Sequence, residues 1–116
     1  MAADARFVGP RGTFSDIALF RVKRGAASAV GLLGRTDMGP DEALMLKARQ
    51  VHTIGMRFAI DVLYIDAAKT VIKVQTLRPG RVGPIVWRAR FIIEMKKGEA
   101  ARRGIAPGWR LEVDGG

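Results

Sequence analysis

The sequence contains no cysteine and only one histidine. The absence of cysteine excludes disulfides and thiolate metal sites, and it fits a reducing compartment. No stretch approaches the roughly 18 uninterrupted apolar residues that a transmembrane helix needs. The first twelve residues, MAADARFVGPRG, also lack the apolar segment of a secretory signal. These absences predict a cytoplasmic protein with no transmembrane segment.

The composition is typical of a folded protein. Of the 116 residues, 48% are apolar and 27% are charged, as in globular rather than disordered chains. A chain of this length buries enough surface to fold without a disulfide or a structural metal. No repeat, low-complexity tract or linker interrupts it. We therefore expect a single domain over residues 1–116, with an irregular segment over 1–15 and a β-rich core over 16–113.

The chain has a positive charge of +9, from 20 Lys and Arg against 11 Asp and Glu. Most of this excess lies in the second half of the sequence, where the basic residues form no block of five or more. They include Lys69, Lys73, Arg78, Arg81, Arg88 and Arg90. Such a surplus favours contact with nucleic acid, anionic lipid or an acidic protein partner through long-range attraction. The alternative is a solvated basic surface that serves only solubility.

Short apolar runs separated by glycine and proline are typical of β-strands and turns. They predict strands over residues 17–23, 43–47, 58–66, 71–77, 90–95 and 110–113. Short helices are expected over residues 25–33 and 99–103. The predicted fold is mostly β: a small antiparallel β-sandwich or jelly-roll-like domain with one or two short helices.

The most informative segment is Val51–Asp66, which reads VHTIGMRFAIDVLYID. If its second half is extended, successive side chains alternate between two faces, and both faces are apolar. One face would hold Phe58, Ile60, Val62 and Tyr64, and the other Ala59, Asp61, Leu63 and Ile65. This strand should be covered on both sides, so Asp61 is costly to bury unless it is paired or hydrogen-bonded. Asp66 is expected in the following turn, where its carboxylate accepts hydrogen bonds from backbone N–H groups.

Three segments together carry a resemblance to a known family: GLLGRTDMGPDEALML, VHTIGMRFAIDVLYID and ARFIIEMKKGEAARRGIAPGWRLEV, at residues 31–46, 51–66 and 89–113. From about residue 25 to the C-terminus the chain resembles domain of unknown function family 192, also called uncharacterised protein family 0127. The resemblance implies a compact β-sandwich-like domain found in bacteria and archaea, with exported and cytosolic members. It implies no established activity.

Four residues match the pattern of that family and are carried over as candidates: His52, Met56, Asp61 and Glu94. The chain also departs from the pattern. The usual Phe-Pro-Ile-Asp is Phe-Ala-Ile-Asp at residues 58–61, which loses a stiffening proline and keeps the aspartate. Where the family tends to have Pro-Gly-Asp, this chain has Pro-Gly-Trp at residues 107–109. If that aspartate serves a site or a cap in relatives, this chain lacks it.

An acid–base site is one interpretation of these residues. A carboxylate at Asp61 or Glu94 would fix the tautomer of His52 and raise its basicity. This alternative predicts that the three side chains converge on one pocket. The sequence offers no complete catalytic frame such as G-x-S-x-G beside them. Because one histidine among carboxylates does not suit a dedicated zinc site, we expect no metal and no cofactor.

The leading hypothesis is a non-enzymatic binding or protein-interaction module of unknown ligand. Its candidate ligand-binding residues are Met56, Arg57, Trp87, Arg88 and Arg90. The last three form the only aromatic–basic cluster of the sequence, which suits an anionic ligand or an acidic protein partner. A third interpretation is a basic adaptor that contacts nucleic acid, although no known nucleic-acid-binding motif is present.

Overall fold

The computed structural model describes residues 2–11, 17–24 and 35–113, which fold mostly as β-structure. Along these residues the elements are β1 (Ala2–Val8), β2 (Ile17–Arg24), β3 (Glu42–Leu46), β4 (Ile60–Asp66), β5 (Val71–Leu77), β6 (Ala89–Lys96), α1 (Glu99–Arg102) and β7 (Arg110–Val113). The predicted fold class, a mostly β chain of sandwich type with a short helix, is confirmed.

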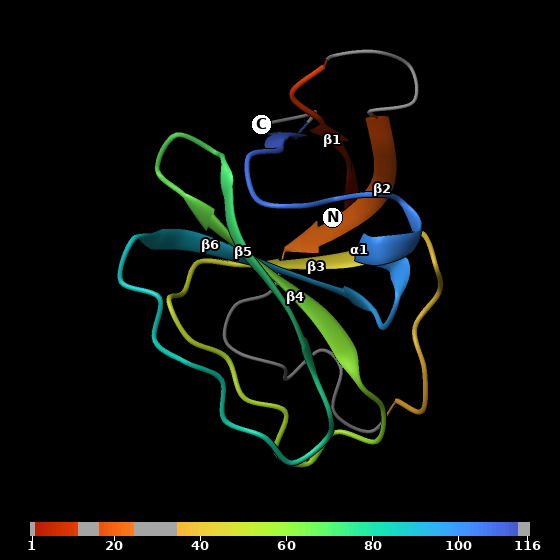
Figure 1. Cartoon of the computed structure of the whole chain (residues 1–116). Helices are drawn as coiled ribbons and strands as arrows, with labels where there is room; N and C mark the ends of the chain where they lie inside the picture. The colour runs from red at the N-terminus through yellow and green to blue at the C-terminus, as the bar shows by residue number, and fades with distance from the viewer. Residues whose placement is uncertain (1, 12–16, 25–34, 114–116) are drawn as a thin grey trace.

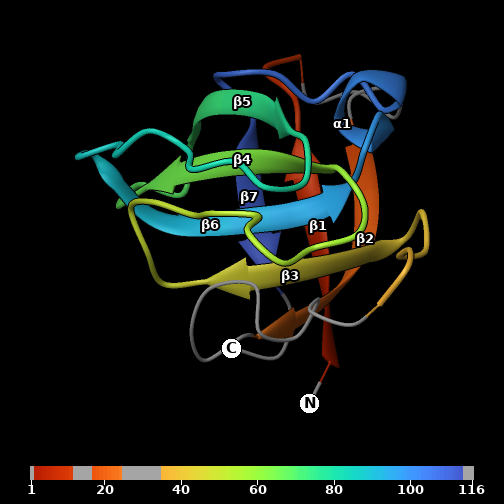
Figure 2. The same cartoon turned by 90° about the horizontal axis from the view of Figure 1, so that it is seen from below.

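The strands are hydrogen-bonded in the order β5-β4-β6-β3-β2-β1-β7 (Figure 1). Neighbouring strands run antiparallel except β2 and β3, which are parallel. The half made of β2, β1 and β7 crosses the half made of β5, β4, β6 and β3 at a steep angle (Figure 2). The two halves therefore pack face to face as the layers of a small β-sandwich.

Two apolar clusters lie on opposite faces of β4 and β6. The first, here called the sandwich core, joins β4 and β6 to β1, β7 and the segment around α1: Ala5, Phe7, Ala43, Met45, Leu63, Ile65, Val71, Ile93, Met95, Ala100, Ile105, Trp109 and Leu111. The second, the loop-covered core, joins them to β3 and to the chain before β4: Met38, Leu44, Leu46, Val51, Met56, Ile60, Val62, Tyr64, Leu77, Ala89 and Ile92.

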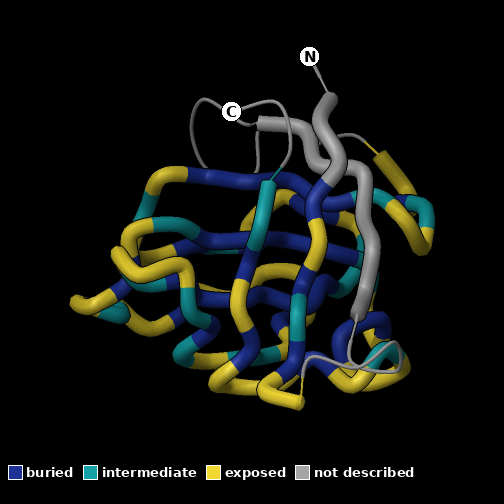
Figure 3. The backbone as a smooth tube through the Cα atoms, turned by 90° about the horizontal axis from the view of Figure 1, so that it is seen from above, coloured by how far each residue is buried: buried dark blue, intermediate teal, exposed yellow. Residues whose placement is uncertain are grey.

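The central strand β4 has the two covered faces that its sequence predicts. Val62 and Tyr64 belong to the loop-covered core, whereas Leu63 and Ile65 belong to the sandwich core. Burial is concentrated in the paired strands, and the exposed stretches lie at the connecting loops (Figure 3). An apolar strand with no polar face is stable only when both of its sides are covered, as here.

The irregular segment predicted over residues 1–15 is corrected by the structure, because β1 covers Ala2–Val8 and pairs with both β2 and β7. Alanine and aspartate have low strand propensity, so the local pattern offers little sign of this strand. The strand is specified by its two neighbours and by the burial of Ala5 and Phe7. The helix predicted over residues 25–33 lies outside the described residues.

Within the described residues, no helix has the length and apolar character to cross a membrane.

Candidate functional site

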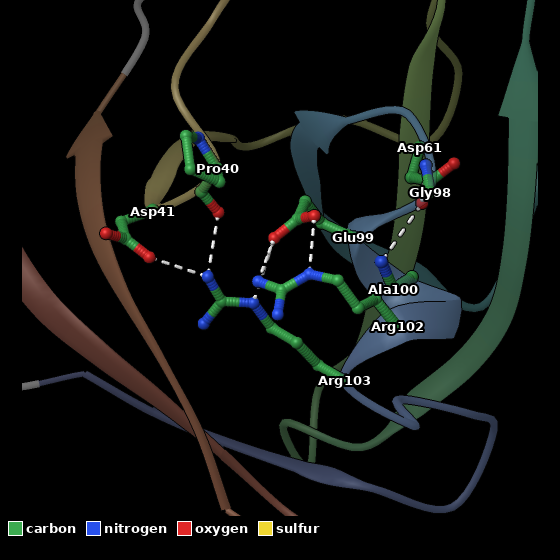
Figure 4. Close-up of polar contacts among 8 residues, drawn as sticks. All are labelled: Pro40, Asp41, Asp61, Gly98, Glu99, Ala100, Arg102 and Arg103. Atoms are coloured by element: carbon green, nitrogen blue, oxygen red, sulfur yellow. Dashed lines mark hydrogen bonds and ion pairs between the residues drawn. The ribbon is translucent and has the colours of Figure 1, made fainter.

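Asp61 is buried on β4, and both of its carboxylate oxygens accept hydrogen bonds. Its Oδ1 accepts a hydrogen bond from the Thr76 hydroxyl at 2.7 Å. Its Oδ2 accepts from the backbone N–H groups of Gly98 at 3.0 Å and Ala100 at 3.1 Å (Figure 4). The latter two groups stand at the start of α1, where backbone donors lack helical partners. Asp61 therefore fastens the β6–α1 turn to the sheet.

A second polar group lies on the other side of α1 (Figure 4). The Arg103 guanidinium, with 14% of its side chain exposed, donates to Asp41 Oδ1 at 2.6 Å, to the Pro40 carbonyl at 2.9 Å and to Glu99 Oε1 at 3.3 Å. Arg102 donates to both oxygens of Glu99, and its hydrogen bonds hold the pKa of Glu99 below its usual range. The group links α1 to the chain before β3.

Glu94 is fully buried, and neither of its carboxylate oxygens has a hydrogen-bond partner. It pairs with Leu44 on β3 and with Val62 on β4, so it points into the loop-covered core. This apolar burial raises its pKa to about 7, because the ionised form cannot be solvated there. Burial together with the charge of Glu94 raises the pKa of Tyr64 to about 12.

His52 is hydrogen-bonded to neither Asp61 nor Glu94. It is half-buried, and its Nδ1 accepts a hydrogen bond from the Ile54 backbone N–H at 3.3 Å. Since Asp61 and Glu94 point to opposite faces of the sheet, they cannot both meet one imidazole. The described residues contain no group of three His, Cys, Asp or Glu side chains that could hold a metal ion. His52, Asp61 and Glu94 therefore do not form one cluster.

The sheet face that carries Glu94 is covered by two long loops, residues 47–59 and 78–88, which we call the double loop (Figure 1). Backbone hydrogen bonds tie one loop to the other: Thr53 N–H to Arg81 O at 2.8 Å, Gly80 N–H to Thr53 O at 2.9 Å, Gly83 N–H to Val51 O at 2.9 Å and Val86 N–H to Arg49 O at 2.8 Å. Thr53 is fully buried, and its hydroxyl donates to the Arg78 carbonyl and accepts from Arg81 N–H. The loops therefore pair as an irregular antiparallel ribbon.

The double loop has a one-sided charge. It contains six basic residues and no aspartate or glutamate: Lys47, Arg49, Arg57, Arg78, Arg81 and Arg88. All six are exposed. Charges of one sign that are not neutralised locally produce a positive potential outside the surface.

At one end of the double loop Trp87 stands with 74% of its area exposed. Beside it lies a hollow of about 350 Å³ that is lined by three arginines, Arg49, Arg88 and Arg90, and by the turn at residues 66–68. The carboxylate of this turn, Asp66, accepts hydrogen bonds from the N–H groups of Ala68 and Thr70. A second hollow of about 320 Å³ shares Arg49 and Arg90 and adds Lys47. Arg49 Nε donates to the Trp87 carbonyl at 3.0 Å, which holds this guanidinium at the hollow. Planar guanidinium groups in such an arrangement suit phosphate or carboxylate oxygens.

The candidate ligand-binding residues of the sequence fall into two environments. Trp87, Arg88 and Arg90 lie together around one hollow. Met56 is instead buried in the loop-covered core, and Arg57 is exposed beside it in the chain.

Sequence reasoning did not select several residues that share this surface: Lys47, Arg49, Ile54, Val82 and Ile85. The signal that could have indicated them is the complete absence of carboxylates from residues 47–59 and 78–88. The pairing of these two loops, which are far apart in the sequence, was needed to bring the residues together.

Two solved bacterial proteins illustrate the similarity in fold. One is a "putative transcription regulator" from Sinorhizobium meliloti 1021, with a TM-score of 0.78 and 20% identity over 97% of this chain and 94% of that one. Another is a protein of unknown function from Novosphingobium aromaticivorans DSM 12444, with a TM-score of 0.80 and 20% identity over 96% of this chain and 84% of that one. At this identity the likeness shows the fold alone. No curated protein matches the chain by sequence.

A family model matches most of the sequence. The model of DUF192, described as an uncharacterized ACR, matches residues 9–113. This range includes the double loop and all the strands from β2 to β7. The suspected family is confirmed, and the chain belongs to the DUF192 family.

Proposed function

We propose that this protein is a non-enzymatic binding module whose partner is anionic and contacts the double loop. The observation that carries the proposal is the exposure of six basic residues, without a single carboxylate, on two loops that are hydrogen-bonded to each other. A cytoplasmic location is part of the proposal, supported by the absence of cysteine.

The arrangement of side chains supports binding rather than catalysis. Asp61 and the Glu99–Arg103 group are used in holding α1 to the rest of the fold. Glu94 is enclosed in an apolar core, away from solvent. The exposed charged and aromatic groups of the double loop are guanidinium, ammonium and indole groups, which bind anions and stack on flat or apolar partners.

Direct titration with two soluble polyanions tests the proposal. A ten-residue polyglutamate peptide and a single-stranded oligothymidine are added to isotopically labelled protein at low salt, and amide shifts are followed by NMR. We expect shifts confined to the double loop and an affinity that falls steeply with added salt.

A pair of charge-matched variants separates a binding surface from general net charge. Arg81→Gln with Arg88→Gln removes two exposed cations from the double loop, and Lys73→Gln with Lys97→Gln removes two exposed cations elsewhere. The first pair should weaken binding about thirtyfold and the second only slightly, since each basic residue near an anionic surface contributes on the order of 1 kcal/mol. Equal weakening would mean that binding follows the net charge of the whole protein, and it would overturn the double loop as the binding surface.

A further inference from the structure

The exposed large hydrophobic side chains of the described residues lie on the double loop, together with its six exposed basic residues. Among the described residues, the large hydrophobic side chains that are exposed are Ile54 at 54%, Val82 at 64%, Ile85 at 46% and Trp87 at 74%. All four belong to the double loop. Isolated exposed hydrophobic residues are ordinary, but a set confined to one surface marks a contact site.

The architecture of the double loop explains why these side chains point outward. Val51 and Gly83 are buried, and a Cβ on Gly83 would lie 3.2 Å from the Tyr64 hydroxyl, so the inner side of the ribbon packs directly on the sheet. His52 and Val82 form the antiparallel bridge between these inward positions. Alternation along a ribbon therefore places Val82 on the outer side.

The apolar residues are spread along the length of the ribbon. Ile54 follows Thr53, which is bonded to Gly80 and Arg81 at one end of the ladder. Trp87 lies beyond the Arg49–Val86 bond at the other end. Exposed arginines lie near both ends, Arg81 beside Thr53 and Arg49 and Arg88 beside Trp87, so each end of the ribbon carries apolar and cationic groups.

We propose that the double loop docks this protein on the surface of an anionic lipid bilayer. The inference rests on the proposed function and names the partner of that surface. Exposed aliphatic side chains gain free energy by entering the boundary between headgroups and acyl chains. Indole rings prefer the same depth, and Lys and Arg around them are attracted by anionic headgroups.

Bilayers fit these observations better than other polyanions do. Nucleic acid and acidic peptides offer phosphates or carboxylates to the arginines, and nucleic-acid bases can stack on Trp87. They offer no apolar medium for Ile54, Val82 and Ile85. Arg49, Arg88 and Arg90 line the hollow beside Trp87 together with the turn at Asp66, and their guanidinium groups suit a headgroup phosphate.

Vesicle flotation tests the inference. The protein is mixed with vesicles of phosphatidylcholine alone and with vesicles in which about a third of the lipid is phosphatidylglycerol, a fraction chosen to give a strongly negative surface. We expect binding to the anionic vesicles only, weakened by salt. Trp87 emission should shift to the blue on binding, while Trp109, which is 6% exposed, supplies a constant background.

A double variant completes the test. Ile54→Ser with Val82→Ser keeps the charge and should lower binding to anionic vesicles by about tenfold or more, because two exposed aliphatic side chains no longer insert. The same variant should bind polyglutamate as the parent protein does. Circular dichroism checks that both substitutions, at exposed positions, leave the fold intact.

The outcomes separate the two proposals. If polyglutamate binds and anionic vesicles do not, the membrane inference is overturned and the anionic-partner function stands. If neither binds, both are overturned. If vesicles bind equally well with Ile54→Ser and Val82→Ser and without a blue shift, the bilayer acts only as another polyanion and the membrane inference is wrong.

Discussion

Asp61 and Glu94 are carboxylates on neighbouring strands that point to opposite faces of one sheet. Asp61 pairs with Met95 and Val62 pairs with Glu94 in the register of β4 and β6. Asp61 thus reaches the donors of Gly98 and Ala100, whereas Glu94 is enclosed among apolar side chains without a partner. The two buried acids, one register step apart, therefore affect stability in opposite ways. Asp61 holds two segments together, whereas ionisation of Glu94 lowers the stability of the fold.

Replacing Asp61 should destabilise the fold in a way that depends on hydrogen bonds more than on charge. Asp61→Ala leaves the N–H of Ala100 buried without an acceptor and removes the bonds to Gly98 and Thr76. We expect a loss of about 3 kcal/mol in the free energy of unfolding, measured by urea denaturation.

Asp61→Asn is the matched control. Its amide oxygen can accept from Gly98 and Ala100, and its NH₂ group can donate to the Thr76 hydroxyl. It should therefore cost less than half as much as Asp61→Ala. If the two substitutions are equally destabilising, the charge of Asp61 rather than its hydrogen bonding is responsible.

Glu94 should make the protein less stable as pH rises through neutrality. In the unfolded chain its pKa is near 4.5, and in the fold burial raises it to about 7. Between these values the folded state binds more protons than the unfolded state, so the free energy of unfolding falls with increasing pH. Keeping Glu94 protonated therefore contributes about 3 kcal/mol to the free energy of unfolding. This contribution is complete below about pH 4.5 and is lost above about pH 7.

Urea denaturation at several pH values checks this, with Glu94→Gln as the test variant. An amide of the same shape as the protonated acid does not titrate, so the variant should lack this decline. Glu112→Gln serves as the control, because Glu112 is hydrogen-bonded to Arg6 and its pKa is lowered by that contact. A decline that persists in Glu94→Gln would assign it to another group.

The sequence predicted the parts of this fold that depend on local pattern. The alternation in β4 indicated two covered faces, and Asp66 does accept from the N–H groups of Ala68 and Thr70 in the turn. The partners of Asp61 were beyond local pattern, because Gly98 and Ala100 are nearly forty residues away along the chain.

The proposed binding surface could be predicted only in part from the sequence, for a related reason. Trp87, Arg88 and Arg90 are close in the sequence and could be recognised as a cluster. Arg49 joins them through a hydrogen bond to the Trp87 carbonyl, and this contact exists only because residues 49–53 pair with residues 80–86. Whether an apolar side chain such as Val82 is exposed also depends on that pairing.

Gly83 should be sensitive to the addition of a single methyl group. A Cβ there would lie 2.9 Å from the Val51 carbonyl oxygen and 3.2 Å from the Tyr64 hydroxyl. Gly83→Ala should therefore push the two loops apart at the Gly83–Val51 bond and cost about 1–3 kcal/mol. The measurement is hydrogen exchange, in which the amides of Gly83 and Thr53 should exchange faster.

Gly80→Ala separates this crowding from backbone strain. Gly80 has φ of 77°, and a Cβ added to it would meet no atom within 4 Å. Its substitution should cost about 1 kcal/mol through the left-handed conformation alone, without faster exchange at Gly83. Unchanged exchange in Gly83→Ala would show that the sheet accommodates the methyl group.

Arg103 and Arg102 provide a last comparison, since both contact Glu99 from neighbouring positions. Arg103 is mostly buried and also donates to Asp41 and Pro40, whereas 61% of the Arg102 side chain is exposed. Arg103→Lys replaces a guanidinium that spans three acceptors with one ammonium group, so we expect a loss of about 1–2 kcal/mol. Arg102→Lys should cost less than about 0.5 kcal/mol, because an exposed ion pair contributes little. Both losses are measured by urea denaturation, and equal values would mean that the contacts of Arg103 with Asp41 and Pro40 do not stabilise the position of α1.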